Sequence, residues 1–165
     1  MTHIQNNSGN QEHYSPSRFV ESAREVMGSI DLDPASNEIA NSWIKATSIY
    51  TKEDCGLSKV WTGNLWLNPP YDSKMLKLFV DKLVGSDVQA TVLTNNNTET
   101  ACGQKLLKWC DSICLINKRV RFIKPDGTEN KNPLQGQVIY YKGSNCTKFF
   151  QEFSQHGVVF ERNKV

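Results

Sequence analysis

Hydrophobic and polar positions along the chain predict alternating helices and strands. Apolar residues at helical spacing predict helices over residues 15–27, 37–46, 73–85, 103–110 and 145–157. Short apolar or alternating runs predict strands over residues 29–33, 48–50, 64–67, 89–95, 112–118, 119–123, 137–141 and 158–162. Because helices and strands alternate, we expect an α/β fold built from βαβ units, with a largely parallel sheet and flanking helices.

The beginning of the chain divides into two parts. Residues 1–12 are polar and rich in Asn and Gln, so we expect a disordered tail there. Ser15 is the expected N-cap of the first helix and Pro16 its first helical residue, because proline suits a position whose N–H needs no partner. We expect residues 13–165 to form one domain around a single core.

Composition sets broad limits. The chain has 165 residues, 38% of them hydrophobic and 22% charged, which is typical of a globular protein. Its formal charge of +2 neither requires nor excludes a nucleic-acid partner. The polar N-terminus and the lack of a long apolar run predict a cytoplasmic protein. The five cysteines contain no Cys-x-x-Cys pair and the histidines are scattered, so we expect reduced thiols and no metal site.

Candidate functional residues follow three predicted strands. Ligands of open α/β sheets bind at the carboxyl ends of the strands. The polar segments at these places are Asp33–Ser36, Asn68–Tyr71 and Asn95–Asn97. An Asp-Pro pair is also an ordinary turn opener, and the three asparagines suit a plain polar loop as well as a pocket. The run Asn68-Pro69-Pro70-Tyr71 is too unusual to be only a turn.

The chemistry of this run suits an amino group on a nucleobase. Such an amine is a poor nucleophile because its lone pair is delocalised into the ring. The Asn68 side-chain oxygen and the carbonyl of Pro69 are two acceptors for its two N–H groups, and accepting both frees the lone pair. The prolines hold both acceptors in place, and Tyr71 offers a ring on which an extruded base stacks. Catalysis is then mainly positioning.

Asn-Pro-Pro-Tyr is the catalytic motif of the amino methyltransferases that use S-adenosylmethionine. In order, "YSPSRFVESAREVMGSIDLDPASNEIAN", "IYTKEDCGLSKVWTGNLWLNPPY", "KRVRFIKPDG" and "QVIYY" resemble the small Dam-like adenine methyltransferases of bacteriophages and prophages. The resemblance implies a compact, Rossmann-like class I methyltransferase fold. Asn68 follows Asp33 by only 35 positions, which is too few for a full methyltransferase sheet, so we expect a trimmed version of this fold. The resemblance further implies methylation of adenine in double-stranded DNA with the base flipped out, and a phage or restriction–modification role.

The resemblance also implies site residues. Asn68, Pro69, Pro70 and Tyr71 are expected to form the target-base site. The expected cofactor-binding residues are Tyr14, Ser15, Pro16, Asp33, Pro34, Ser36 and Asp54, with Glu53 a weaker candidate for the ribose. The usual first motif continues into a glycine-rich turn, whereas this chain reads "DPASNEI". Glycine allows close approach of the backbone to a cofactor, so this turn departs from the family pattern.

The basic residues between 118 and 131 suggest a place for DNA. Those expected to contact phosphates are Lys118, Arg119, Arg121 and Lys124, with Lys131 nearby. Charged side chains of this kind also protect solvated strand edges from aggregation, so both interpretations stand.

Three alternative functions share these residues. Cytosine or a protein glutamine offers a planar amino group to the same motif. The third is a non-catalytic nucleic-acid-binding or decoy module that retains the fold.

Overall fold

The computed structural model describes residues 13–163, so the tail predicted for residues 1–12 lies outside the described part. The helices are α1 (Ser17–Met27), α2 (Glu38–Ile44), α3 (Ser73–Val84), α4 (Ala101–Trp109) and α5 (Cys146–Phe153), with a short 3₁₀ helix η1 (Gly56–Ser58). The strands are β1 (Leu32–Asp33), β2 (Ser48–Ile49), β3 (Asn64–Leu67), β4 (Gln89–Asn95), β5 (Ser112–Ile116), β6 (Gln137–Lys142) and β7 (Gly157–Glu161).

All seven strands belong to one mixed sheet with the order β2-β1-β3-β4-β6-β5-β7. The pairs β1–β2, β1–β3 and β3–β4 are parallel. Strand β6 pairs antiparallel with both β4 and β5, and β7 pairs antiparallel with β5. The predicted α/β class is therefore confirmed. The expectation of a largely parallel sheet holds only for the part formed by β2, β1, β3 and β4.

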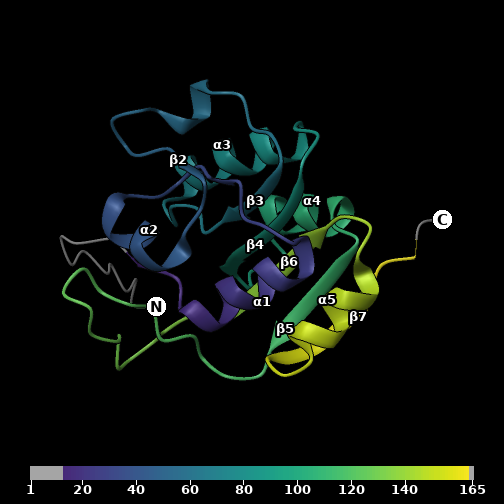
Figure 1. Ribbon diagram of the computed structural model, residues 1–165. Coiled ribbons are helices and arrows are strands. Elements are labelled where there is room, and N and C mark those ends of the chain that lie inside the picture. Colours follow the sequence, from purple (N-terminus) through teal and green to yellow (C-terminus); the bar gives the residue numbers. More distant parts are fainter. Residues whose placement is uncertain (1–12, 164–165) are drawn as a thin grey trace.

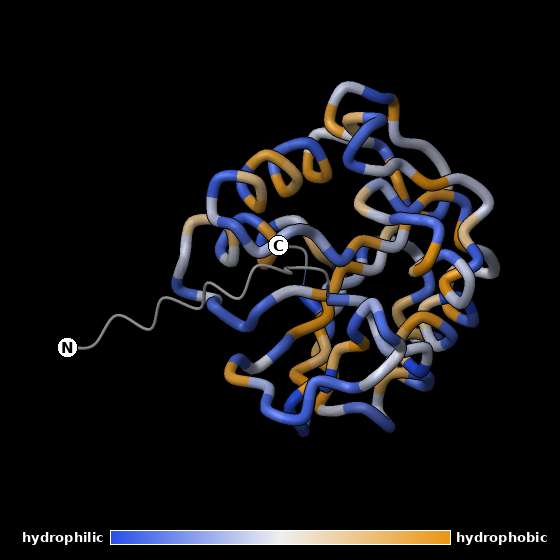
Figure 2. The backbone as a smooth tube through the Cα atoms, turned by 90° about the vertical axis from the view of Figure 1, so that its left-hand side faces the viewer, coloured by the Kyte–Doolittle hydropathy of each residue, from blue (hydrophilic) through white to orange (hydrophobic). Residues whose placement is uncertain are grey.

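Helices cover both faces of this sheet (Figure 1). On one face, α1 packs against α2 and α5, and their apolar side chains form one cluster with those of the sheet. On the other face, α3 packs against α4 around a second cluster. Figure 2 shows the corresponding pattern in the backbone, with hydrophobic segments through the middle of the molecule and hydrophilic segments in many of the connections. No helix among residues 13–163 is long and apolar enough to cross a membrane.

Two local predictions were wrong. The first helix begins at Ser17 with Pro16 at the N-cap position, and no side chain caps it there. Ser15 is therefore not the N-cap, and Pro16 is not the first helical residue. Residues 119–123 do not form a strand: only Ile123 makes bridges, one with Tyr14 and one with Glu129. Alternating apolar residues made this segment look like a strand, but no neighbouring strand pairs along it.

Candidate active site

The carboxyl ends of β1, β3 and β4 meet at one edge of the sheet. Leu32 of β1 pairs with Leu65 of β3, and Leu67 of β3 pairs with Val92 of β4. Because these strands are parallel, Asp33, Asn68 and Asn95 lie at the same edge, as the sequence predicted for strand-end residues. Leu65, Trp66 and Leu67 are fully buried, so β3 is a rigid support for the segment that follows it.

Asn68 is held in one orientation by two hydrogen bonds. Its side-chain Nδ2 donates to the backbone carbonyl of His13 over 2.9 Å. Its Oδ1 accepts from the hydroxyl of Tyr71 over 2.8 Å. The structure thus fixes which end of the carboxamide is the acceptor, and that acceptor faces Tyr71.

Tyr71 is half-buried against the apolar cluster of α1, α2 and α5. Its ring meets the ring of Phe122 edge-on, with centroids 6.1 Å apart. Burial raises the pKa of its hydroxyl above the usual value, so the group stays a neutral donor. Pro69 is buried and Pro70 is exposed, which anchors the turn on one side.

Two further side chains join this group. The Tyr71 hydroxyl also lies 3.2 Å from Oε1 of Gln137, whose Nε2 donates to Oδ1 of Asn95 over 2.7 Å. Asn95 was a candidate from the sequence, whereas Gln137 was not. Gln137 opens β6, and only the antiparallel direction of that strand brings its first residue to the carboxyl edge of β4.

The N-terminal segment closes over the same edge. Tyr14, Ser15 and Pro16 are buried, and the carbonyl of the preceding His13 is the partner of Asn68. The Tyr14 hydroxyl accepts from Nδ2 of Asn37, at 3.2 Å. The predicted cofactor residues of the first segment and the predicted catalytic segment are therefore neighbours.

Asp33 is buried at the end of β1, with 2% of its surface exposed. Its Oδ1 accepts from the backbone N–H of Ala35 at 3.2 Å. Burial raises the pKa of this carboxyl to about 7, although the Ala35 N–H and the Ser36 hydroxyl act in the opposite direction. A buried acid whose pKa remains raised is suited to a ligand that brings donors or positive charge.

Two buried hydroxyls near this turn make no hydrogen bond of normal geometry among the described residues. Ser15 is 1% exposed, and its hydroxyl has no hydrogen-bond partner within the described residues. The Ser36 hydroxyl is near enough to Asp33 to lower its pKa, yet it makes no hydrogen bond of normal geometry in the same part of the chain. Buried polar groups ordinarily find partners, so both fit the polar groups of a bound cofactor.

The turn Asp33–Ser36 is covered by the segment around Gly56. Tyr50 binds this turn through two backbone bonds, to Asp33 and to Ser36. A Cβ atom at Gly56 would lie 2.5 Å from the carbonyl oxygen of Pro34, so only glycine allows this approach. Gly56 thus lets its segment pack directly on the Pro34 carbonyl.

Asp54 and Glu53 lie in the same segment and are exposed. Asp54 accepts from both the N–H and the hydroxyl of Thr51, each over 3.0 Å, and these bonds hold the pKa of its carboxyl below the usual value. Hydrogen bonding, first to its own backbone N–H, likewise lowers the pKa of Glu53. These bonds lie within one turn and do not reach Asp33 or Asn68, so the predicted roles of both acids rest on the sequence.

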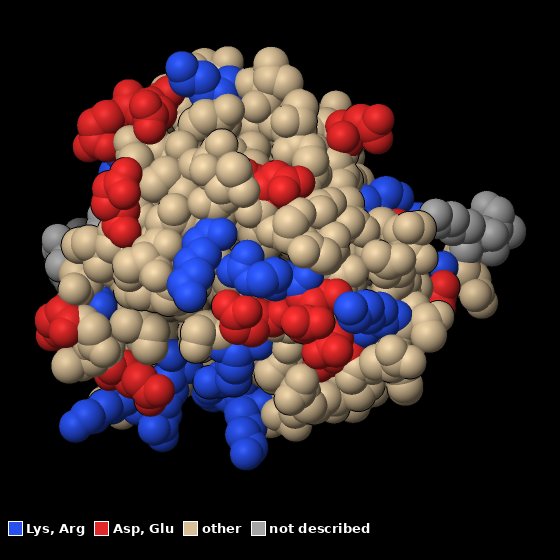
Figure 3. All heavy atoms as spheres, viewed as in Figure 1, with Lys and Arg blue, Asp and Glu red and all other residues tan. Residues whose placement is uncertain are grey.

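The basic segment runs beside the site. Tyr14 and Ile123 exchange two backbone bonds of 2.9 Å, which places residues 119–124 next to the N-terminal segment. The basic residues of this segment are Lys118, Arg119, Arg121 and Lys124, and all four are exposed. Figure 3 shows Lys and Arg side chains gathered along the lower rim of the molecule.

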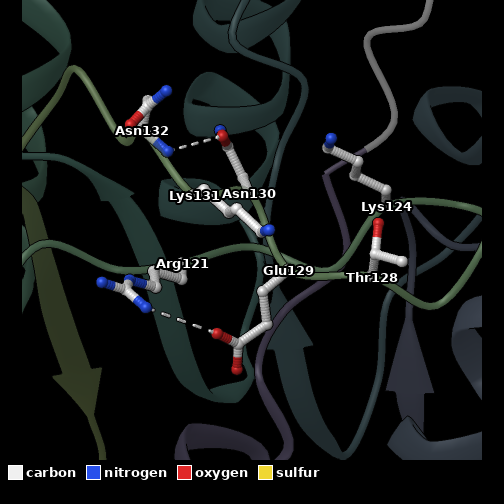
Figure 4. Close-up of a pocket in the computed structure, with 7 residues that line it drawn as sticks. All are labelled: Arg121, Lys124, Thr128, Glu129, Asn130, Lys131 and Asn132. Carbon is white, nitrogen blue, oxygen red and sulfur yellow. Dashed lines mark hydrogen bonds and ion pairs between the residues drawn. The ribbon is translucent and has the colours of Figure 1, made fainter.

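A hollow of about 630 Å³ lies within this segment. It is lined by Arg121, Lys124, Thr128, Glu129, Asn130, Lys131 and Asn132 (Figure 4). Arg121 points toward Glu129, with 3.9 Å between their charged atoms, while Lys124 and Lys131 carry no ion pair in Figure 4. Among residues 13–163, no group of three or more His, Cys, Asp or Glu side chains is arranged to hold a metal ion.

This mixed sheet, with helices on both faces and polar residues at its carboxyl edge, is the α/β fold of a Rossmann-like methyltransferase. The family model described as DNA N-6-adenine-methyltransferase (Dam) matches residues 3–152, and the chain belongs to this family. Comparison with curated proteins gives no match. The resemblance seen in the sequence is thus confirmed at the level of the family.

Proposed function

We propose that this protein transfers a methyl group from S-adenosylmethionine to the exocyclic amine of adenine in double-stranded DNA. The observation that carries the proposal is the Asn68 carboxamide, whose oxygen is fixed as an acceptor at the carboxyl edge of the sheet. The family supports adenine as the target base. The family match gives no comparable support to cytosine or to a protein glutamine as the methyl acceptor.

The proposed catalytic step uses hydrogen-bond acceptors. Asn68 Oδ1 and the carbonyl of Pro69 accept the two N–H groups of the target amine, which draws the nitrogen lone pair out of the ring. S-adenosylmethionine, when bound, would supply its sulfonium methyl group to the amine and would be released as the neutral thioether. The methylated nitrogen would lose one proton to water. Asn68 and Pro69 supply geometry, so no general base of shifted pKa is required.

The cofactor is assigned to the buried edge beside this site. We assign Asp33, Pro34 and Ser36 to one side of the cofactor, and Tyr14, Ser15 and Pro16 to another. The buried acid and the two buried hydroxyls of Ser15 and Ser36 favour a polar, cationic ligand there. Asp54 completes the assignment by family resemblance, in a turn whose segment packs on Pro34.

We assign DNA to the exposed basic segment. Arg119 and Arg121 closely precede Phe122 in the sequence, and the Phe122 ring contacts the Tyr71 ring. Phosphates bound by these arginines would bring a flipped base toward Tyr71, whose ring is expected to stack on it. Lys118 and Lys124 extend the same surface.

The remaining parts of the proposal concern context. We infer that residues 13–165 act as one methyltransferase domain in the cytoplasm of a bacterial host, with the protein encoded by a phage or prophage. A restriction–modification role is consistent with adenine methylation.

A radiolabelled methyl-transfer assay on unmethylated duplex DNA, followed by nucleoside analysis, tests this function. Wild-type protein should yield N6-methyladenine. Asn68→Ala should lower the rate about a hundredfold to a thousandfold, because a transition-state acceptor is removed. Cofactor affinity, measured by calorimetry, should largely survive.

Asn68→Asp is the informative companion variant. It keeps an acceptor but replaces the amide that donates to the His13 carbonyl, so we expect an intermediate rate. Wild-type protein that binds S-adenosylmethionine but modifies no base would favour the decoy alternative. Methylation by Asn68→Ala at the wild-type rate would refute the mechanism.

A further inference from the structure

The Tyr71 hydroxyl lies between two carboxamide oxygens. Oδ1 of Asn68 is 2.8 Å away and Oε1 of Gln137 is 3.2 Å away. A phenol has one proton, so it donates to one of these oxygens at a time. The shorter distance indicates that the proton points to Asn68 in this structure.

Both carboxamides are fixed with their oxygens toward Tyr71. Gln137 is 5% exposed and stands opposite Asn95 in the β4–β6 pair. Its Nε2 donates to Asn95 over 2.7 Å, which turns its oxygen toward Tyr71. The bond from Asn68 to the His13 carbonyl does the same for Asn68. The hydroxyl can therefore change partner by rotation alone, without movement of either amide.

This arrangement matters for the proposed reaction, on which the inference rests. When Asn68 accepts from the target amine, a phenol that donates to the same oxygen weakens it as an acceptor. We propose that Gln137 is a positioning residue. Its Oε1 accepts the hydrogen bond of the Tyr71 hydroxyl in place of Asn68, which leaves Oδ1 of Asn68 free to accept from the target amine. Only the O–H bond rotates, and no covalent bond forms or breaks.

A similar trio at the opposite end of β4 provides a matched control. There the Tyr141 hydroxyl donates to Oε1 of Gln89 over 2.7 Å, and Nε2 of Gln89 donates to Asn64 over 2.8 Å. Gln89 begins β4 and Asn95 ends it, so this second trio lies away from the candidate site. Gln89→Met removes the same kinds of bonds as Gln137→Met.

The test is a double-mutant cycle with Tyr71→Phe and Gln137→Met, measured as kcat for methylation of duplex DNA. Gln137→Met should lower kcat about tenfold, the effect of one hydrogen bond, with the KM for S-adenosylmethionine unchanged. In the double variant kcat should equal that of Tyr71→Phe alone. Without the Tyr71 hydroxyl, no hydrogen bond to Asn68 has to be redirected to Gln137. Gln89→Met should leave kcat unchanged.

Several outcomes would overturn the inference. Rate reductions that multiply in the double variant would mean that Gln137 acts independently of the Tyr71 hydroxyl. A reduction of kcat in Gln89→Met equal to that in Gln137→Met would mean that both glutamines act through the stability of the protein. If Gln137→Met does not fold, Gln137→Glu retains an acceptor and should keep at least about a third of the wild-type rate, so a rate as low as that of Asn68→Ala refutes the proposal. An inactive wild type refutes the proposed function together with this inference, whereas an active wild type with multiplied reductions refutes only the inference.

Discussion

Replacing the buried acid Asp33 by Asn should make the protein more stable at high pH. Burial raises the pKa of Asp33 from 3.8 to about 7 in the folded chain. The folded state therefore keeps a proton that the unfolded chain has released, so the free energy of unfolding falls as pH rises from about 4 to about 7. Above pH 7 the folded protein contains a buried carboxylate.

The size of the effect follows from this difference in pKa. At pH 8.5, ionised Asp33 is expected to cost up to about 4 kcal/mol of stability. Asn has no charge and still accepts from the Ala35 N–H, so Asp33→Asn should recover much of this energy. The advantage of the variant should grow by about 3 kcal/mol between pH 5 and pH 8.5.

Urea unfolding of both proteins at these two pH values measures the effect. Asp126→Asn is the control, because its carboxyl is exposed and bonds from Thr128 lower its pKa. The Asp126 carboxylate contributes to stability above about pH 4, and this contribution disappears on acidification. The difference in unfolding free energy between Asp126→Asn and wild type should therefore stay constant between about pH 5 and about pH 8.5. A pH-independent difference for Asp33→Asn would show that Asp33 does not titrate as a buried group.

The same variant separates stability from function. If Asp33 serves a cationic cofactor, Asp33→Asn should weaken S-adenosylmethionine binding by roughly 1–3 kcal/mol even though the free protein becomes more stable. Calorimetry at pH 8.5 measures this. Unchanged affinity would remove Asp33 from the site.

Two further predictions test the edges of the site. Replacing both Arg119 and Arg121 by Ala should weaken DNA binding and reduce its salt dependence by up to about one unit of slope for each phosphate that is no longer bound; an unchanged slope in binding titrations would place the DNA elsewhere. Gly56→Ala should cost about 1–3 kcal/mol in urea unfolding and weaken cofactor binding, because its Cβ meets the Pro34 carbonyl. Wild-type stability in that variant would mean that the Gly56 segment moves aside without cost.

The sequence alone located the strand ends that carry the candidate site. Buried runs that stop at Asp33, Asn68 and Asn95 placed polar residues at one edge, because parallel strands share a direction. Helix periodicity was equally informative, since an apolar stripe has to face the sheet. These are local signals, and they hold wherever each element finally lies.

The tertiary structure decided what the local pattern does not contain. Residues 119–123 alternate like a strand, but no strand pairs along them, and Phe122 contacts Tyr71 instead. Ser15 resembles a cap, but its hydroxyl is buried without a partner within residues 13–163. The antiparallel insertion of β6 between β4 and β5 brings Gln137 to Tyr71. Strand order and direction depend on hydrogen bonds between distant segments, and periodicity along the chain does not encode them.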